Sequence, residues 1–245
     1  MIIQSVTQIT SIYRPKYLII LDILTENILY YLKIKRLIVE VFVIRYVLVV
    51  TYISAAGLLK KIYGIEAVVP KELLTLPQGR YIIVANHRKA IDTYLILATL
   101  PFPAFYNLLP IRFFTANIFL KYWWQRLFLI PYGSFRAYST EDKISGVKGG
   151  LYLSDRGQSL FIFPEGKRMR NGAKRELKVG VAYLAQRRDF TILPVYINYS
   201  KKTFFKKTKV SWGKPFKIED ASKSQDLEKL TSQIFSKVLN LSTKT

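Results

Sequence analysis

The stretch "IIVANHRKAID", residues 82–92, contains the single histidine of the chain, His87. The β-rich run "YIIVAN" (81–86) leads into this histidine, and residues 91–100 have helical composition. In open α/β sheets, functional sites form where strands end and helices begin. The stretch therefore predicts a buried strand, then a turn that carries His87, and then a helix.

Strand-like and helix-like segments alternate from about residue 62 to the end of the chain. Strands are expected at 81–86, 112–116, 129–135, 159–166, 190–200 and 207–216. Helices are expected at 91–100, 117–129, 140–156, 179–188 and 220–239. This alternation predicts an α/β fold in which helices flank a central sheet.

His87 and Asp92 are separated by five residues, which places their side chains about 140° apart on a continuous helix. If His87 lies in the turn and Asp92 on the first turn of the helix, the carboxylate can reach back to the imidazole. An Asp bonded to one ring nitrogen fixes the tautomer and leaves the other nitrogen free to take a proton from a hydroxyl. The pair is then a general base. The spacing alone leaves open a structural histidine held by a nearby carboxylate.

A second polar cluster, "FPEGKRMRNG" (163–172), follows another strand-like run. The proline and glycine beside Glu165 predict a tight turn that presents backbone N–H groups to a cleft. Lys167 and Arg168 begin a basic run, and arginines beside such a turn suit bidentate capture of phosphate. A solvated basic surface loop is the alternative interpretation.

The two clusters resemble the motifs of one family. His87 and Asp92 form an N-H-x-x-x-x-D motif, and "FPEGKR" (163–168) is similar to F-P-E-G-T-R. Both occur in this order in the glycerolipid acyltransferases, which are typified by 1-acyl-glycerol-3-phosphate acyltransferase. Lys167 stands where that family usually has Thr, and this departure leaves the identity of the acyl acceptor open.

Two weaker blocks support the resemblance, which covers about residues 75–215. "YGSFR" (132–136) looks like a block that ends in a phosphate-binding arginine, which corresponds to Arg136. "ILPVYI" (192–197) is similar to the closing strand motif of the family. The resemblance implies a mixed central sheet with flanking helices, like that of the glycerol-3-phosphate acyltransferases.

The resemblance implies transfer of a fatty acyl group from acyl-CoA or acyl-carrier protein to the sn-2 hydroxyl of 1-acyl-glycerol-3-phosphate. The product would be phosphatidic acid for phospholipid biosynthesis. His87 would be the general base and Asp92 its orienting partner. The residues expected to bind the acceptor or shape its site are Arg136, Glu165, Gly166, Lys167 and Arg168. No metal and no bound cofactor are expected, because the acyl thioester is a co-substrate and the chain has no cysteine.

Composition indicates the kind of partner. The 245 residues include 38 Lys and Arg against 16 Asp and Glu, a formal net charge of +22, and half of all residues are hydrophobic. Basic and apolar character together suit a protein that lies against anionic membrane lipids, since apolar burial and charge attraction add there. Nucleic acid is not expected as a partner. Two alternatives stay open: another acceptor (glycerol 3-phosphate, another lysophospholipid or a lyso-aminolipid), or a non-catalytic basic membrane- or nucleic-acid-binding protein.

The N-terminal part is densely apolar. Two runs, 17–32 and 37–59, are separated by "KIKR" (33–36), and they predict a helical hairpin that lies on or crosses the membrane. A pair of core helices is the alternative. We expect a membrane-anchoring segment at 1–61 and an α/β acyltransferase domain at 62–245, associated with the cytoplasmic face of the inner or plasma membrane. No cleavable signal peptide is expected, because a basic start and a small-residue cleavage site are missing.

Overall fold

The computed structural model describes residues 16–136, 145–168, 176–187, 189–199, 207–218 and 226–242. The first residues of the helices expected at 140–156 and 220–239 lie outside these ranges. The helices are α2 (Lys16–Ile62), α3 (Asp92–Leu97), α4 (Phe102–Asn107), α5 (Trp123–Leu129), α6 (Ser145–Ser154), α7 (Gly180–Arg187) and α8 (Leu227–Leu239), with short 3-10 turns η1 (Lys71–Leu73), η2 (Asn117–Leu120) and η4 (Asn240–Ser242). The strands are β1 (Ile65–Val68), β2 (Tyr81–Ala85), β3 (Ile111–Thr115), β4 (Ser134–Arg136), β5 (Ser159–Ile162), β6 (Thr191–Tyr199) and β7 (Thr208–Trp212).

The strands form one seven-stranded sheet in the order β1-β7-β6-β2-β5-β3-β4. The strands from β6 to β4 in this order run parallel to one another, whereas β7 is antiparallel to β6 and β1 is parallel to β7. The predicted mixed central sheet is therefore confirmed. β2 lies in its middle and is buried along its whole length, as expected for an apolar strand that is covered on both faces.

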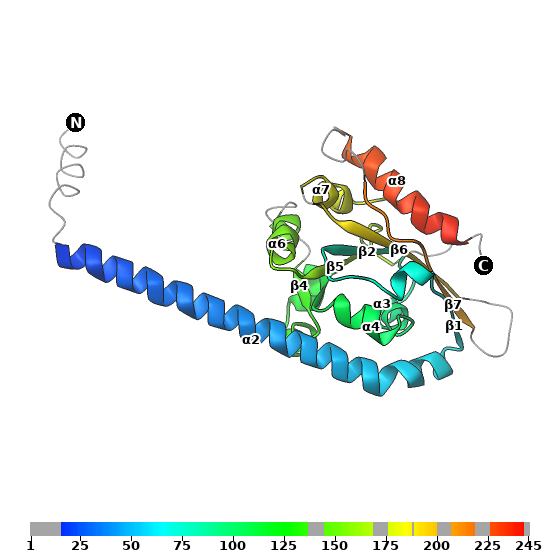
Figure 1. Ribbon diagram of the computed structural model, residues 1–245, viewed down its shortest axis with the longest axis horizontal. Helices are drawn as coiled ribbons and strands as arrows, with labels where there is room; N and C mark the ends of the chain where they lie inside the picture. Colours follow the sequence, from blue (N-terminus) through cyan, green and yellow to red (C-terminus); the bar gives the residue numbers. More distant parts are fainter. Residues whose placement is uncertain are drawn as a thin grey trace. The chain divides into compact units, whose positions relative to one another are not determined.

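Helices cover both faces of the sheet (Figure 1). Successive residues of a strand point to opposite faces, and β2 shows the consequence. Ile83 packs in a core cluster with side chains of α3, α4 and the part of α2 from Ile44 onward. Ile82 packs in a second cluster with side chains of α6, α7 and α8. The domain thus has three layers, and β2 contributes to both cores.

The predicted helical hairpin is wrong, because α2 is one continuous helix from Lys16 to Ile62. The charged stretch 33–36 was expected to separate two helices. It contains neither glycine nor proline, and lysine and arginine are good helix formers. Charge interrupts the apolar pattern there without interrupting the backbone.

The chain divides into two compact units, residues 1–43 and residues 44–245, and α2 runs through the division. Ile44 and Leu48 are buried in the core of the second unit. The compact unit therefore begins at Ile44, upstream of the expected boundary between residues 61 and 62. The last turns of α2 are part of the domain.

The face of α2 that points away from the buried residues Ile44 and Leu48 is also apolar. Tyr46 is 63% exposed and Ile53 is 69% exposed. Within the described residues, one helical stretch, Lys35–Ile62, is long and apolar enough to cross a membrane. A helix that is apolar all round is typical of a protein core or a membrane, and here one side of the helix is covered by the domain.

Candidate active site

The two polar clusters lie at neighbouring strand ends. β2 and β5 are adjacent and parallel, with Val84 opposite Ile162, so their carboxyl ends meet at the same edge of the sheet. The chain leaves β2 into the loop that carries His87, and it leaves β5 into the turn that carries Glu165. The sheet order thus brings together two motifs that are far apart in the sequence.

His87 and Asp92 are in direct contact. Asp92 is the first residue of α3, and its carboxylate reaches back so that Oδ2 lies 3.0 Å from His87 Nδ1. Asp92 is fully buried, whereas the His87 side chain is 18% exposed. A carboxylate oxygen can only accept a hydrogen bond, so Nδ1 carries the hydrogen, and in the neutral imidazole Nε2 then has the free lone pair. This tautomer is the one that a general base requires.

Other donors fix the Asp92 carboxylate. Its Oδ2 also accepts from the backbone N–H of Arg88 at 2.5 Å and of Lys89 at 2.8 Å. Its Oδ1 accepts from the hydroxyl of Tyr199. Both oxygens of this buried carboxylate are therefore satisfied. The position and the orientation of the His87 ring follow from a carboxylate that cannot rotate freely.

Tyr199 is the contact that the sequence did not reveal. Burial, and then its hydrogen bond to Asp92, raise the pKa of Tyr199 well above the usual value of a phenol. The hydroxyl therefore stays protonated and remains a donor. The Lys89 ammonium lies 3.8 Å from the centre of the Tyr199 ring, a cation–π contact. Tyr199 ends β6, the other neighbour of β2.

The turn after β5 packs directly on the histidine loop. Glu165 is buried, and its Oε2 accepts from the backbone N–H of His87 at 2.6 Å. The Phe163 ring stacks on the imidazole, with ring centres 4.0 Å apart. Gly166 has a φ of 64°, a left-handed conformation that favours glycine. Glu165 therefore does more than shape its own turn, because it also holds the backbone of His87.

Asn86 secures the end of β2. Its side-chain amide donates to the backbone oxygen of Ile197 at 2.9 Å and accepts from the backbone nitrogen of Ile197 at 2.8 Å. This pair of bonds continues the ladder between β2 and β6 by one step beyond Ala85, where strand pairing ends. The histidine loop therefore starts from a fixed point.

The basic candidates lie at the same edge of the sheet. Lys167 and Arg168 are exposed directly after the turn, and Arg136 is exposed at the end of β4. β4 is two strands from β5, which corresponds to about 10 Å at the usual strand spacing. The rest of the basic run, residues 169–175, lies outside the described residues. His87, Asp92 and Glu165 thus form one hydrogen-bonded group. Arg136 lies at the same edge of the sheet, two strands from β5.

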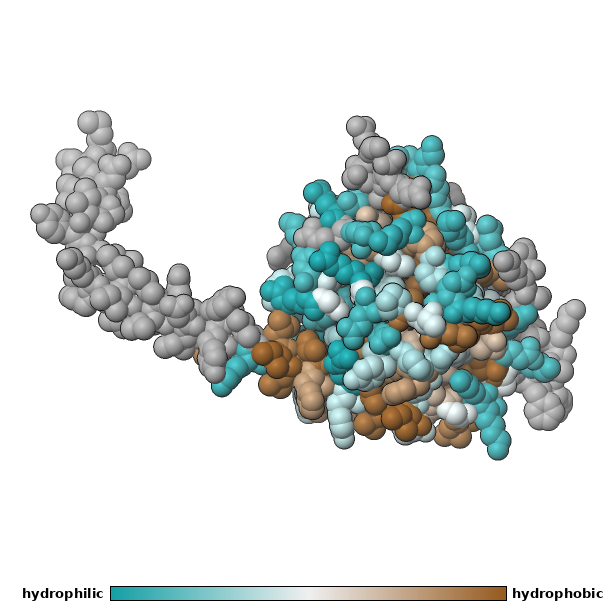
Figure 2. All heavy atoms as spheres, in the orientation of Figure 1, coloured by the Kyte–Doolittle hydropathy of each residue, from teal (hydrophilic) through white to brown (hydrophobic). Residues whose placement is uncertain are grey.

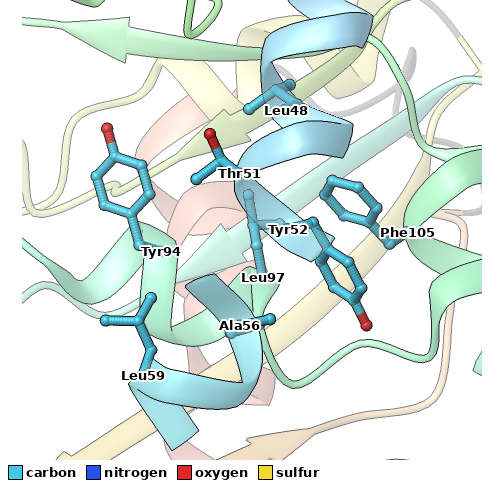
Figure 3. Close-up of a pocket in the computed structure, with 9 residues that line it drawn as sticks. Leu48, Thr51, Tyr52, Ala56, Leu59, Tyr94, Leu97 and Phe105 are labelled. Atoms are coloured by element: carbon cyan, nitrogen blue, oxygen red, sulfur yellow. The ribbon is translucent and has the colours of Figure 1, made fainter. Parts of the chain in front are cut away.

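A small apolar pocket lies between α2, α3 and α4, where Tyr52 stacks on Phe105 with ring centres 4.4 Å apart (Figure 3). The pocket is lined by Leu48, Thr51, Tyr52, Ala56, Leu59, Tyr94, Leu97, Ala98 and Phe105. None of these side chains carries a charge at neutral pH, so the pocket does not suit a phosphate. The exposed basic side chains Arg136, Lys167 and Arg168 are at the strand ends instead.

The chain is similar to known proteins in sequence and in fold. The sequence model of the Acyltransferase family matches residues 62–198. The crystal structure of the 1-acyl-sn-glycerophosphate (LPA) acyltransferase PlsC from Thermotoga maritima is similar, with a TM-score of 0.54 and 17% sequence identity. The match covers 85% of this chain and 92% of that chain. This similarity shows a common fold.

Proposed function

Because this chain belongs to the acyltransferase family, we propose that it moves a fatty acyl group from a thioester to the sn-2 hydroxyl of 1-acyl-glycerol-3-phosphate. The observation that carries the proposal is the 3.0 Å contact between His87 Nδ1 and Asp92 Oδ2. It leaves Nε2 as a proton acceptor on a partly exposed side chain after the end of β2. The acceptor is the one named for the similar structure.

The reaction needs one base and no covalent enzyme intermediate. His87 Nε2 takes the proton of the acceptor hydroxyl while the hydroxyl oxygen forms the new ester bond with the thioester carbonyl carbon. The carbon–sulfur bond breaks, and the imidazolium donates the proton to the leaving thiolate, which returns His87 to its neutral form. Asp92 stabilises the imidazolium between these steps. No metal or bound cofactor enters this scheme, because acyl-CoA or acyl-carrier protein is the second substrate.

The basic residues at the sheet edge suit the phosphate of the acceptor. A guanidinium binds phosphate through two parallel hydrogen bonds, and Arg136 and Arg168 are both exposed. Lys167 adds a point charge beside them. We assign these three side chains to the acceptor phosphate, and Glu165 and Gly166 to the turn that presents Lys167 and Arg168.

We further propose that the protein works at the cytoplasmic face of a membrane. The apolar outer face of α2 supports membrane attachment, and the net charge of +22 supports a surface rich in anionic lipid. Residues 1–61 would then be the membrane-anchoring segment and residues 62–245 the acyltransferase domain, with the last turns of α2 both anchoring the chain and packing on the domain.

An acyl-transfer assay tests the function. The purified full chain is incubated with acyl-CoA or acyl-carrier protein and with one of four acceptors: 1-acyl-glycerol-3-phosphate, glycerol 3-phosphate, a neutral-headgroup lysophospholipid or a lyso-aminolipid. We expect phosphatidic acid from the first acceptor. His87→Ala should abolish it while far-UV circular dichroism stays unchanged.

Faster transfer to another acceptor would replace the proposed substrate and keep the chemistry. Equal thioester consumption by the wild type and His87→Ala would refute the role of the histidine. If no acceptor is acylated and DNA is bound tightly, the protein is a non-catalytic basic module.

A further inference from the structure

The η2–α5 segment, residues 117–130, carries an apolar surface that the fold does not cover. None of the seven residues of α5, all of them described, is buried. Six large apolar side chains of the segment are at least half exposed: Ile118, Phe119, Trp123, Trp124, Leu127 and Phe128. Contiguous exposed apolar surface of this kind marks a site of contact with another body.

The charge around this segment identifies an anionic partner. No acidic residue occurs between Asp92 and Glu141 in the sequence, whereas Lys121 and Arg126 lie within the segment itself. A second copy of the chain fits poorly, because it has a net charge of +22 and would bring positive charge to a positive surface. An anionic lipid surface supplies the opposite charge.

The side chains also suit the boundary between lipid and water. Trp123, Trp124 and Tyr122 carry amphipathic rings, and such rings are enriched at the level of lipid headgroups. Trp123 is 76% exposed, the most of any large apolar side chain described. Leu127 and Phe128 follow at helical spacing and add apolar area.

The chain that follows the segment leads onto α2. The chain just after α5 packs on α2: a Cβ at Gly133 would lie 3.4 Å from the Ile44 side chain, and Thr51 donates to the Tyr132 hydroxyl at 3.1 Å. Apolar residues gather along the lower margin of the domain in Figure 2, where Figure 1 places α2, while the upper part is largely hydrophilic. The segment and the exposed apolar face of α2 from Ile44 onward therefore belong to one compact unit.

We propose that the η2–α5 segment is a second membrane-contact surface, which enters the headgroup region of an anionic bilayer beside α2. Trp123 and Trp124 are buried among headgroups, and Lys121 and Arg126 meet lipid phosphates. The proposal builds on the proposed membrane attachment through α2. Arg136 lies a few residues further along the chain, so the contact also brings lipid close to the proposed phosphate site.

The three tryptophans make the contact measurable without a label. Trp212 is buried in the core, whereas Trp123 and Trp124 are exposed. The full chain is mixed with vesicles of phosphatidylcholine and phosphatidylglycerol whose acyl chains carry bromine, a quencher of tryptophan emission. We expect a blue shift and strong quenching. Trp123→Phe/Trp124→Phe should bind equally well but show neither, because Trp212 stays in the core.

A second variant tests the affinity. Leu127→Ser/Phe128→Ser should weaken vesicle binding about tenfold or more, since each side chain loses apolar burial. The matched control is Leu74→Ser/Tyr152→Ser, which removes two apolar side chains of similar exposure from other parts of the surface. The control should bind vesicles like the wild type.

Quenching that is absent while the protein still co-sediments with vesicles would overturn the proposal and leave attachment through α2 intact. A blue-shifted emission without vesicles, together with a dimeric mass in light scattering that Leu127→Ser/Phe128→Ser abolishes, would assign the surface to a second copy instead. Neither readout depends on acyl transfer, so the outcome is separate from that of the enzyme assay.

Discussion

The backbone N–H of His87 donates to Oε2 of Glu165 over 2.6 Å, a bond between two loops that are 78 residues apart in the sequence. The carboxylate thus holds the main chain of the proposed base, while Asp92 holds its side chain. His87 is therefore held through its main chain by Glu165 and through its side chain by Asp92. A substitution at Glu165 or at Asp92 removes one of these contacts and keeps the other.

Glu165→Ala should destabilise the domain by about 1.5–3 kcal/mol, the range for a hydrogen bond to a charged group. Glu165→Gln keeps an acceptor oxygen and should lose less. Urea unfolding followed by circular dichroism measures both. Glu66→Gln, at a carboxylate that is 62% exposed, is the control and should change stability by less than about 0.5 kcal/mol. If all three variants unfold alike, the bond adds nothing to stability.

Asp92→Asn should lower kcat by about a hundredfold to ten-thousandfold. The amide oxygen keeps the position that accepts from Nδ1 and from two backbone N–H groups. It is a weaker acceptor than a carboxylate oxygen, and the substitution removes the charge that stabilises the Nδ1–H tautomer and the imidazolium. The KM for the acceptor should change little. The measurement is steady-state transfer, and the chain offers a direct check: its single histidine gives one imidazole signal set in nitrogen-15 NMR. An unchanged tautomer together with unchanged kcat would contradict the role of Asp92.

Tyr199→Phe should lower kcat about tenfold, because Oδ1 of Asp92 loses its donor and the carboxylate is then held through Oδ2 alone. Burial and the bond to Asp92 raise the pKa of Tyr199. The phenol is therefore neutral in the folded protein at every pH up to and above 10, and the loss of activity should be the same from about pH 6 to pH 9.

The same shift has a consequence for stability. A folded-state pKa above the unfolded value means that the contribution of Tyr199 is complete below about pH 10 and is lost as the pH rises further. Tyr196→Phe is the control for the activity measurement, because Tyr196 lies on the same strand as Tyr199 but packs in the other core cluster. A loss of activity in Tyr199→Phe that varies strongly between pH 6 and pH 9 would mean that the phenol titrates in the working range.

Arg136→Ala and Arg168→Ala should each raise the KM for a phosphorylated acceptor by about tenfold or more, as expected for the loss of a charge-assisted hydrogen bond. The KM for the thioester should stay near the wild-type value. Arg156→Ala removes an arginine that follows α6 and should leave both constants unchanged. A KM for the acceptor that is unaffected by either substitution would move the phosphate site elsewhere.

Local patterns predicted the strand, the turn and the helix around His87, and also the tight turn at Glu165. Each of these depends on residues that are close in the sequence. Tyr199 could not be predicted in the same way, because its contact with Asp92 depends on β6 lying next to β2. Strand order is a property of the whole sheet, and no nearby residue encodes it.

The helical errors have a local cause. The stretch 33–36 interrupts the apolar pattern, but its residues permit a helix, so α2 continues. The helix expected at 117–129 is divided into η2 and α5. Apolar periodicity does not distinguish exposed from buried sides here, because neither α5 nor the outer face of α2 is covered by the fold.

The order of the helices and strands along the chain is also the order in which they are synthesised. α2 leaves the ribosome before any strand of the sheet, so the nascent chain can engage a membrane while the domain is still unfolded. His87 and Glu165 follow, but the carboxylate of Asp92 gains its last donor only when Tyr199 at the end of β6 has emerged. A chain interrupted before β6 therefore carries the residues of the proposed site without their assembled geometry.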